Sequence, residues 1–361
     1  MTAHSARKND LTRFMTALVT ASLLLTTACS PGKGPSSPPT SSASPTGPAQ
    51  PVLPAPGQPP LTGVFRGTQR GQVEEFSSWL GKPVDTVVDF QAAATWQQLS
   101  NPSYLFDHWA GSPYRLVLSV PMRPLKESAD NASGAKGAYD NHFATLGKEL
   151  VKRGYSDAMI RVGWEYNMEG SYSYATDPES FNAYFRRIAS VLRSTPGQRF
   201  TLIWNPGNGS QGVTQDASRF YPGDDVVDVI GLDIYDTGFH PQGYPYPAEC
   251  DQECRSTRST FMWNNMIYGG DRGLKFWADF ARSHNKPMAF PEWGLWSGTK
   301  YPGGDDNSDF IDRMNGFIKD PANRIVMHSY FEWDNEGDAH SLIKNFPKAG
   351  AHFKAEWGKS S

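Results

Sequence analysis

The sequence has few cysteines, a small net charge and no long apolar stretch. Only three of its 361 residues are cysteine. The apolar run from Phe14 to Leu25 is too short for a membrane-spanning helix, which needs roughly 20 apolar residues. The formal net charge of −3 offers no basic surface for a nucleic acid. We therefore expect no nucleic-acid partner and no membrane span, and nothing in the composition calls for a metal or an organic cofactor.

The first 28 residues have the pattern of an export signal. Three basic residues precede the short apolar run, and small residues at 26–28 follow it before Cys29. This pattern is typical of a signal peptide. The segment Leu-Thr-Thr-Ala-Cys resembles a bacterial lipobox, in which the cysteine is lipidated. We expect Cys29 to anchor the protein to the cell membrane, with free secretion after cleavage near Ala28 as the alternative.

Residues 29–60 have the composition of a tether. Residues 30–60 contain 11 prolines, and Ser, Thr, Gly and Ala supply most of the rest. Such a segment buries too little apolar surface to offset its ordering entropy. We expect a disordered tether up to residue 60 and one folded domain over 61–361.

The remaining cysteines, Cys250 and Cys254, lie four residues apart. In an exported chain such a pair favours a disulfide over a metal site. A zinc site would need more Cys or His nearby, and only His240 is close in sequence. We expect a disulfide between the two, stiffening a loop that forms one wall of a cleft.

From residue 61 onward, short β-rich apolar runs alternate with segments of helical periodicity. The pattern predicts eight strands, at 61–66, 86–90, 115–121, 158–164, 200–204, 226–235, 287–292 and 325–333. It also predicts helices at 73–80, 142–152, 177–192, 274–283 and 310–318. Eight strands alternating with helices favour a single (β/α)8 barrel, a TIM barrel. An open doubly wound sheet is the alternative, but no Gly-rich phosphate loop follows the first strand.

Two of the predicted strands end in a glutamate. The fourth reaches Glu165 and the seventh reaches Glu292. Catalytic groups of such barrels lie at the C-terminal ends of the strands. A side-chain period of two directs Arg161 and Glu165 to the same side. Two carboxylates at one barrel mouth are what retaining glycoside hydrolysis requires, one as acid and base and the other as nucleophile.

Three motifs resemble glycoside hydrolase family 26, which includes β-mannanases. They are Arg161-x-x-x-Glu165-x-Asn167, the block from Tyr-Pro-Gly-Asp at 221–224 to Val-Asp-Val-Ile-Gly-Leu-Asp-Ile-Tyr at 227–235, and Pro-Glu-Trp-Gly at 291–294. The resemblance extends over roughly residues 61–357. It implies a retaining enzyme on a (β/α)8 barrel that acts on a polysaccharide without a cofactor.

The resemblance also implies a role for each matched residue. Glu165 would be the acid/base and Glu292 the nucleophile, with Tyr235 donating a hydrogen bond to Glu292. Trp333 would form the floor under the sugar ring at the cleavage site. The full expected substrate-binding set is Arg161, Trp164, Asn167, Trp204, Tyr235, Trp296 and Trp333. Rival carboxylates are Glu169, Glu332 and Glu336, and Asp233 is expected to brace the site.

One residue departs from the family pattern. The position before the acid/base is usually His, and here it is Trp164. A Trp can stack on a sugar, but it has a single hydrogen-bond donor and does not titrate. Our first expectation is an endo-β-1,4-mannanase, with a glucanase, a xylanase or an envelope-glycan hydrolase behind it. A carbohydrate-binding lipoprotein without catalysis and a solute-binding or scaffold lipoprotein are the non-enzymatic alternatives; we expect a monomer.

Overall fold

The computed structural model describes residues 50–55, 57–91, 93–209 and 216–358. The expected signal peptide, Cys29 and most of the tether lie outside the described residues. Within the described part, no helix combines the length and the apolar character that a membrane span requires.

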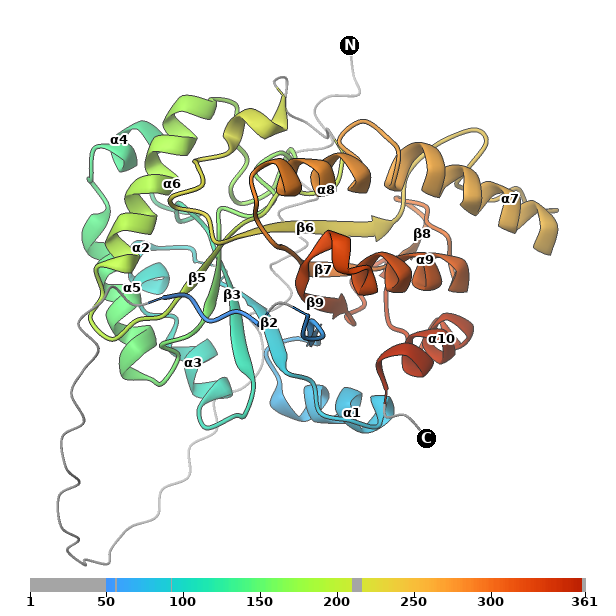
Figure 1. Ribbon diagram of the computed structural model, residues 1–361, viewed down its shortest axis with the longest axis horizontal. Helices are drawn as coiled ribbons and strands as arrows, with labels where there is room; N and C mark the ends of the chain where they lie inside the picture. The colour runs from blue at the N-terminus through green and yellow to red at the C-terminus, as the bar shows by residue number, and fades with distance from the viewer. Residues whose placement is uncertain (1–49, 56, 92, 210–215, 359–361) are drawn as a thin grey trace, which may run out of the picture.

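Eight parallel strands close into a barrel in the order β1-β2-β3-β4-β5-β6-β7-β9, and helices surround it (Figure 1). The barrel strands are β1 (Leu61–Phe65), β2 (Thr86–Phe90), β3 (Arg115–Val120), β4 (Met159–Val162), β5 (Thr201–Trp204), β6 (Val229–Asp236), β7 (Met288–Leu295) and β9 (Ile325–Phe331). Two short strands, β8 (Ser297–Gly298) and β10 (Asp338–Ala339), pair separately. The prediction of a (β/α)8 barrel is confirmed, and its closure excludes the open sheet.

The α-helices are α1 (Arg70–Leu80), α2 (Trp96–Ser100), α3 (Ser103–Trp109), α4 (Asn131–Ala135), α5 (Asp140–Lys152), α6 (Pro178–Arg193), α7 (Gln252–Met262), α8 (Leu274–Ser283), α9 (Ser308–Lys319) and α10 (Pro347–Trp357). Short turns of other helix types are η4 (Ala217–Phe220), η5 (Trp263–Ile267) and η6 (Pro321–Asn323). All five predicted helices are present. The clearest of them, α6, begins after Asp177, whose carboxylate accepts the backbone N–H groups of Glu179 and Ser180.

The apolar residues form two layers. An outer layer lies between the strands and the helices and contains most of the buried aromatic rings. A smaller inner layer fills the barrel and includes Phe65, Phe90, Met159 and Ile203. This division follows from the alternation of side chains along each strand. It decides which strand residues can face the barrel mouth.

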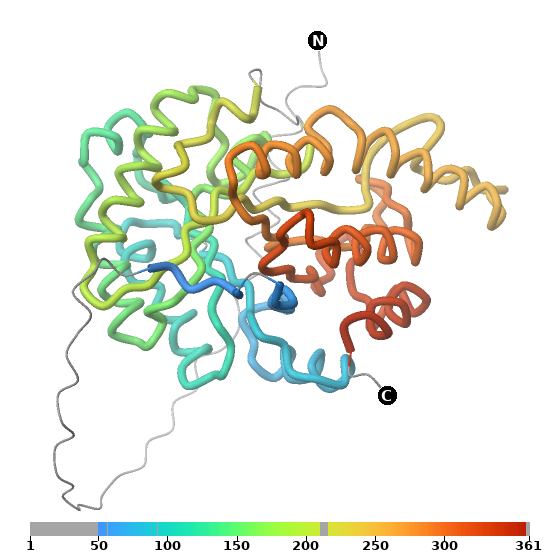
Figure 2. Tube along the Cα trace, viewed as in Figure 1, coloured from blue at the N-terminus to red at the C-terminus, as the bar shows by residue number. Residues whose placement is uncertain are grey.

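The segment before the expected boundary at residue 61 contacts the barrel. Val52 and Leu53, placed in the tether by sequence, lie against the barrel: Leu53 packs on the inner layer, and the Thr201 hydroxyl donates to the Val52 carbonyl at 3.2 Å. Thr201 begins β5, so this contact closes the end of the barrel opposite the strand C-termini. Figure 2 shows the segment in dark blue, passing in front of the green strands. Proline content alone did not reveal these two apolar residues as barrel contacts.

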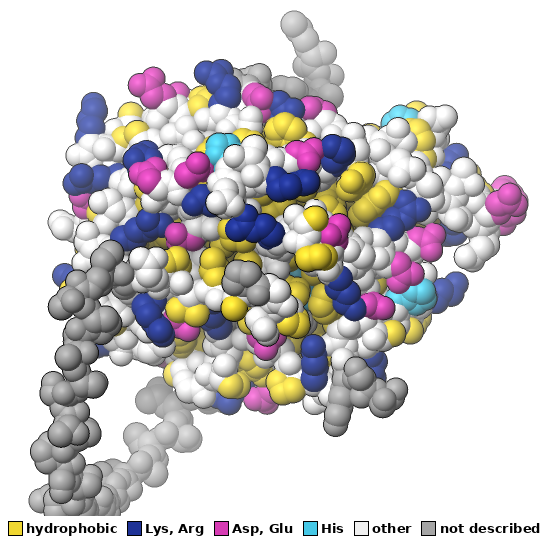
Figure 3. Space-filling model, viewed as in Figure 1, with side chains coloured by type: hydrophobic (Ala, Val, Ile, Leu, Met, Phe, Trp, Pro, Cys, Tyr) yellow, Lys and Arg dark blue, Asp and Glu magenta, His cyan; other side chains and the backbone are white. Residues whose placement is uncertain are grey.

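Charged side chains of both signs are mixed over the face shown in Figure 3. Several form ion pairs between elements, such as Arg186 on α6 with Asp225 at 2.7 Å and Arg193 with Asp228 at 2.8 Å. These pairs connect α6 with the loop before β6. Their surface setting makes each worth only about 0–1 kcal/mol.

Candidate active site

Glu292 lies on β7 at the C-terminal end of the barrel. It is buried, and its position in the ladder is opposite Asp233 of β6. The strand continues past it to Leu295. Strand β7 therefore holds Glu292, as the sequence predicted, although its register with both β6 and β9 shifts next to this residue.

Glu165 reaches the site differently from the sequence prediction. Strand β4 ends at Val162, and the chain then turns through Gly163 with φ 61° and Glu165 with φ 52°. A positive φ is uncommon for a residue with a Cβ and costs of order 1–3 kcal/mol. The Glu165 N–H donates to the Asn205 carbonyl at 2.8 Å, which fixes this turn. The expected continuation of the strand through Glu165 is corrected.

Three carboxylates meet at the barrel mouth. One oxygen each from Glu165, Asp233 and Glu292 lies within 4.8 Å of the others. A retaining glycosidase holds its two carboxyl groups about 5–5.5 Å apart, so the Glu165–Glu292 separation suits a double displacement. Such a trio could also ligate a cation, but the Arg161 guanidinium already occupies the space beside two of its members.

Arg161 connects the barrel interior to Glu292. It is fully buried and donates through Nη2 to Glu292 at 2.7 Å and to Asp233. Its other nitrogens donate to Ser119 at 2.8 Å and to Asn205 at 3.2 Å. A buried guanidinium needs this full set of acceptors. Arg161 therefore positions Glu292 from the interior of the barrel and has no access to a substrate.

Close packing supports this network from β6. Strand β6 carries Gly231, where an added Cβ would lie 2.3 Å from the Asn205 side-chain oxygen. Only glycine leaves room for Asn205 to accept from Arg161. Ser119 was missed at the sequence level; the available signal was a polar residue at an inward position of an apolar strand, paired with Arg161 in the ladder.

Tyr235 donates its phenolic hydroxyl to the second oxygen of Glu292 at 2.9 Å. Burial, and then the charge of Glu292, raise the pKa of Tyr235, so the hydroxyl keeps its proton. His340 packs beside the Tyr235 ring at 5.7 Å and beside Trp296 at 4.4 Å. Its Nδ1 lies 2.9 Å from the Leu295 carbonyl. His340 was also missed, because it follows β9 at a distance in sequence from every motif.

The protonation of Glu165 suits an acid. Burial, and then the charge of Glu292, raise its pKa above the ordinary value of 4.5, while Arg161 opposes the shift. Glu292 receives two hydrogen bonds, from Arg161 and Tyr235, that match a carboxylate charge. The two glutamates thus have different surroundings, as the two roles of a retaining pair require.

Aromatic side chains surround part of the mouth. Trp164 is buried and stacks on Tyr172 at 5.8 Å. Trp333 is partly exposed and lies over Gly67, where an added Cβ would come within 2.7 Å of the ring. Trp296 lies edge-on to Tyr235 at 5.5 Å. Trp333 and Trp296 are therefore near the mouth, and Trp164 supports Tyr172 from within the inner layer.

Besides the buried Arg161 and Trp164, two more of the predicted substrate-binding residues are buried and point away from the mouth. Trp204 is the last residue of β5 and points outward, where it packs on Trp277 at 5.6 Å in the outer layer. The neighbouring Ile203 takes the inward position, so strand alternation is the reason. Asn167 is fully buried and bonds the Gly207 backbone through both ends of its amide. It braces the loop after β5.

The rival carboxylates lie in other settings. Glu332 is buried and accepts the backbone N–H groups of Leu342 at 2.7 Å and Ile343 at 3.2 Å, so it holds the loop after β9. Glu169 and Glu336 are exposed on loops. None of the three belongs to the carboxylate trio. The disulfide between Cys250 and Cys254 is present, directly before and within α7.

Comparison with known proteins supports a family assignment. Residues 68–246 match the model of Glycosyl hydrolase family 26. A β-1,3-xylanase of Alcaligenes sp is 26% identical over 159 residues, which are 44% of this chain and 27% of that protein. The matched segment thus spans about a quarter of that relative's length.

Solved structures support the fold. A double mutant of the Cellulomonas fimi endo-β-1,4-mannanase superposes with a TM-score of 0.53 at 16% identity, covering 82% of this chain and 70% of that one. The catalytic domain of a Bacillus sp. JAMB-750 GH26 endo-β-1,4-mannanase gives 0.53 at 15% identity, covering 84% and 88%.

Proposed function

We propose that this chain, as a member of glycoside hydrolase family 26, is a retaining hydrolase of a β-linked polysaccharide. The observation that carries the proposal is the carboxylate pair: Glu165 and Glu292 lie within 4.8 Å at the mouth of a closed barrel. The family match supports it independently. A barrel of this kind without catalysis would not need Tyr235 and Arg161 both bonded to Glu292.

The two glutamates divide the chemistry between them. In the first step a Glu292 oxygen bonds to the anomeric carbon while the glycosidic bond breaks, and Glu165 gives its proton to the departing oxygen. In the second step Glu165 takes a proton from water, whose oxygen bonds to the anomeric carbon and releases Glu292. Tyr235 and Arg161 hold Glu292 in the orientation that both steps use.

The first candidate substrate is β-1,4-mannan, acted on within the chain. The solved mannanases share the fold. This likeness supports a β-linked polysaccharide as the substrate class and leaves the sugar open. A xylan is the second candidate, because the Alcaligenes relative is a β-1,3-xylanase, and Trp164 weakens the case for mannan. Where family members usually have His, a buried Trp packed on Tyr172 removes a titratable hydrogen-bonding group from the neighbourhood of Glu165.

A panel of polysaccharides tests the function. Residues 50–361 are incubated with β-1,4-mannan, β-1,3- and β-1,4-xylan and mixed-linkage glucan, next to Glu165→Ala and Glu292→Ala. We expect one class to be cleaved and both variants to lose at least about 10³-fold in kcat. The exposed Glu169→Ala, close to Glu165 in sequence, is the matched control and should keep full activity.

Azide distinguishes the two roles. With an activated aryl glycoside, azide should restore turnover to both variants: Glu292→Ala should release the azide of inverted configuration and Glu165→Ala that of retained configuration. Binding of a glycan without cleavage by the native protein would replace the enzyme with the non-catalytic carbohydrate-binding alternative.

We also propose that the protein is exported and held at the cell surface by a lipid on Cys29. The support comes from the sequence of residues 1–29 alone. Metabolic labelling with a fatty acid tests it, because Cys29→Ser should abolish labelling and release the protein into the medium. Unlabelled native protein in the medium would favour ordinary cleavage near Ala28.

A further inference from the structure

The loop after β6 carries an open groove that the proposed chemistry does not use. Its volume is about 430 Å³, and its lining consists of aromatic and proline side chains of residues 239–247 together with Arg258. Phe239 is 61% exposed, the most exposed large apolar side chain in the described residues. A contiguous apolar groove on a protein surface is a common form of ligand-binding site.

The other rings of this loop are held by the protein. The His240 ring packs on Phe261 at 4.4 Å, and Arg255 lies over the Tyr246 ring at 4.4 Å. Tyr244 is fully buried. Phe239 is therefore the ring that the loop leaves open to a ligand.

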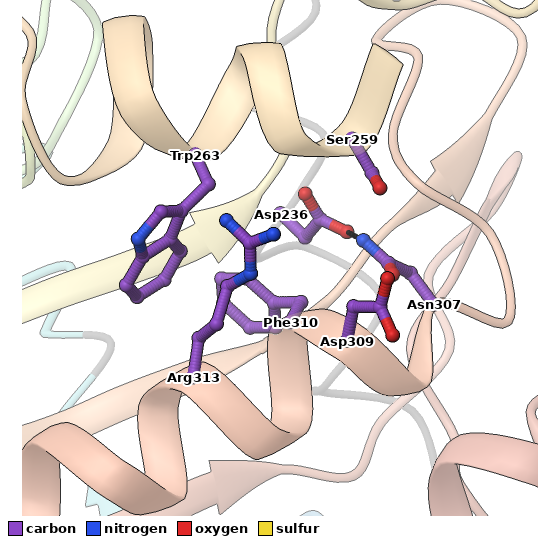
Figure 4. Close-up of a pocket in the computed structure, with 7 residues that line it drawn as sticks. All are labelled: Asp236, Ser259, Trp263, Asn307, Asp309, Phe310 and Arg313. Atoms are coloured by element: carbon purple, nitrogen blue, oxygen red, sulfur yellow. Dashed lines mark hydrogen bonds between the residues drawn. The ribbon is translucent and has the colours of Figure 1, made fainter. Parts of the chain in front are cut away.

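Hydrogen bonds from β6, α7 and the residue before α9 hold the loop in place. Asp236, the last residue of β6, accepts from the Tyr244 hydroxyl at 2.8 Å and from the Asn307 amide at 2.7 Å. Figure 4 shows the Asp236–Asn307 bond between β6 and the start of α9, beside Arg313 and Trp263. Arg258 donates to the Gly243 carbonyl at 2.7 Å. A groove fixed in this way pays little ordering entropy when it binds a ligand.

The strand order places the groove on the path of a glycan. Glu165 follows β4 and Glu292 lies on β7, and they divide the closed ring of strands into two arcs. One arc is β5–β6, and the other is β9–β1–β2–β3. A glycan that passes between the two carboxylates enters over one arc and leaves over the other. Trp333 follows β9 on the long arc, and Phe239 follows β6 on the short arc.

The groove is also close to the reacting bond. Phe239 is four residues beyond Tyr235, whose hydroxyl bonds Glu292. Four residues of extended chain span at most roughly 14 Å, a distance of only a few sugar rings. The groove therefore lies within reach of a polysaccharide that is bound at the carboxylates.

We propose that this groove is a sugar-binding subsite for the leaving-group side of the polysaccharide, in which a pyranose ring packs its C–H face on Phe239. Trp333, expected under the sugar ring that Glu292 attacks, follows β9 on the long arc, so the β5–β6 arc is the leaving-group side. The aromatic and proline lining suits a neutral sugar, which has apolar faces and no charge. This inference rests on the proposed function, because it names where the same substrate binds.

Chain-length dependence tests the subsite. The native protein, Phe239→Ala and Phe239→Tyr are compared on β-1,4-manno- and β-1,3-xylo-oligosaccharides of two to seven units. On the longer ones Phe239→Ala should lose about tenfold in kcat/KM, roughly 1.4 kcal/mol, and should shift the position of cleavage. Phe239→Tyr should keep the native pattern, because it keeps the ring.

Controls separate this site from a general surface effect. Met266→Ala removes another exposed apolar side chain, 39% exposed on η5, and should leave the pattern unchanged. An aryl glycoside with no sugar on the leaving side should be cleaved equally by native protein and Phe239→Ala. An unchanged length dependence in Phe239→Ala would overturn the proposal, and so would a change in its sedimentation that shows Phe239 to be a contact between protein copies.

Binding measurements keep the two proposals distinguishable. Calorimetric titration of Glu292→Ala with the seven-unit oligosaccharides should give weaker binding when Phe239→Ala is added. If the native protein binds these oligosaccharides through Phe239 but cleaves none, the enzyme proposal fails and the groove stands. If it cleaves them with no effect of Phe239→Ala on binding, only the groove proposal fails.

Discussion

At the residue scale, the charged side chains of the site depend on one another for compensation. Arg161 is buried and compensates Asp233 and Glu292 together, so its removal would leave two carboxylates without a countercharge. Glu165 stands apart from Arg161's hydrogen bonds and occupies a backbone conformation with φ 52°. Hydrogen-bond donors thus hold Glu292, and a backbone turn holds Glu165. This difference supports the proposed roles of Glu292 as nucleophile and Glu165 as acid.

The titration of Glu165 gives a pH prediction. Its pKa is raised above 4.5 by burial and by Glu292, so the proton needed for the first step is present at neutral pH and is lost as the pH rises through the raised pKa. Activity on an unactivated glycan should therefore fall on the alkaline side. Glu165→Gln should lose this activity.

An activated substrate supplies the matched measurement. A nitrophenyl glycoside needs no proton for its first step, so Glu165→Gln should form the glycosyl-enzyme with no alkaline limb due to this residue. The measurement is the pre-steady-state burst as a function of pH. Full activity of Glu165→Gln on the polysaccharide, with its alkaline limb unmoved, would contradict the assignment.

At the scale of elements, the segment before β1 belongs to the barrel. Leu53 packs on the inner layer, and the Val52 carbonyl accepts from Thr201 at the first residue of β5. The opposite end of the strands carries the catalytic groups. The segment should therefore contribute to stability and leave catalysis alone, which is the usual division between the two faces of such barrels.

Truncation of this segment tests that division. Leu53→Ala should lower the free energy of unfolding by roughly 1–2 kcal/mol, because the side chain is only partly buried. Its kcat should stay at the native value. Urea unfolding and steady-state kinetics measure the two effects, with the exposed Gln50→Ala as the control. A loss of kcat in Leu53→Ala without loss of stability would contradict this role.

At the scale of the whole molecule, two buried ionisable groups make the free energy of unfolding depend on pH in opposite directions. Burial raises the pKa of Asp89 from 3.8 to about 6, although Trp109, Phe90 and Thr68 donate to it. Its contribution to stability is present at low pH and is lost as the pH rises through 6. Burial lowers the pKa of His340 from 6.5 to about 4, so its contribution is present above 6.5 and is lost as the pH falls through 4.

Asp89→Asn should make the effect of His340 on the pH dependence of stability easier to measure. Without the carboxyl, the part of the decline between about pH 4 and 6 that Asp89 causes disappears, while Asp236, whose pKa burial also raises to about 6, keeps its own part. The free energy of unfolding should therefore rise more steeply with pH than in the native protein. The difference between pH 4 and 7 should amount to about 3 kcal/mol at most. Urea unfolding at several pH values measures it. The exposed Glu336→Gln removes a charge in another place and should keep the native slope, and an unchanged slope in Asp89→Asn would refute the assignment.

The sequence by itself determined the elements whose local signals agree. Strands with β-branched and apolar runs were found at their observed places, and α6 was found from Asp177, Pro178 and one apolar stripe. Helix α7 was not predicted, because Gln252–Met262 is mostly polar and has no such stripe. The short pair β8 and β10 has two residues in each strand, too few for any pattern.

For the site, the sequence predicted which residues carry the chemistry, since strand-end glutamates are recognisable along the chain. Only the tertiary structure decided their partners, because the hydrogen bonds that Arg161 donates to Ser119, Asn205 and Asp233 join segments far apart in sequence. It also decided that Trp204 faces the helices and that Leu53 faces the barrel. A side chain's face depends on where its strand begins and on what packs against it, and that is settled only when the barrel closes.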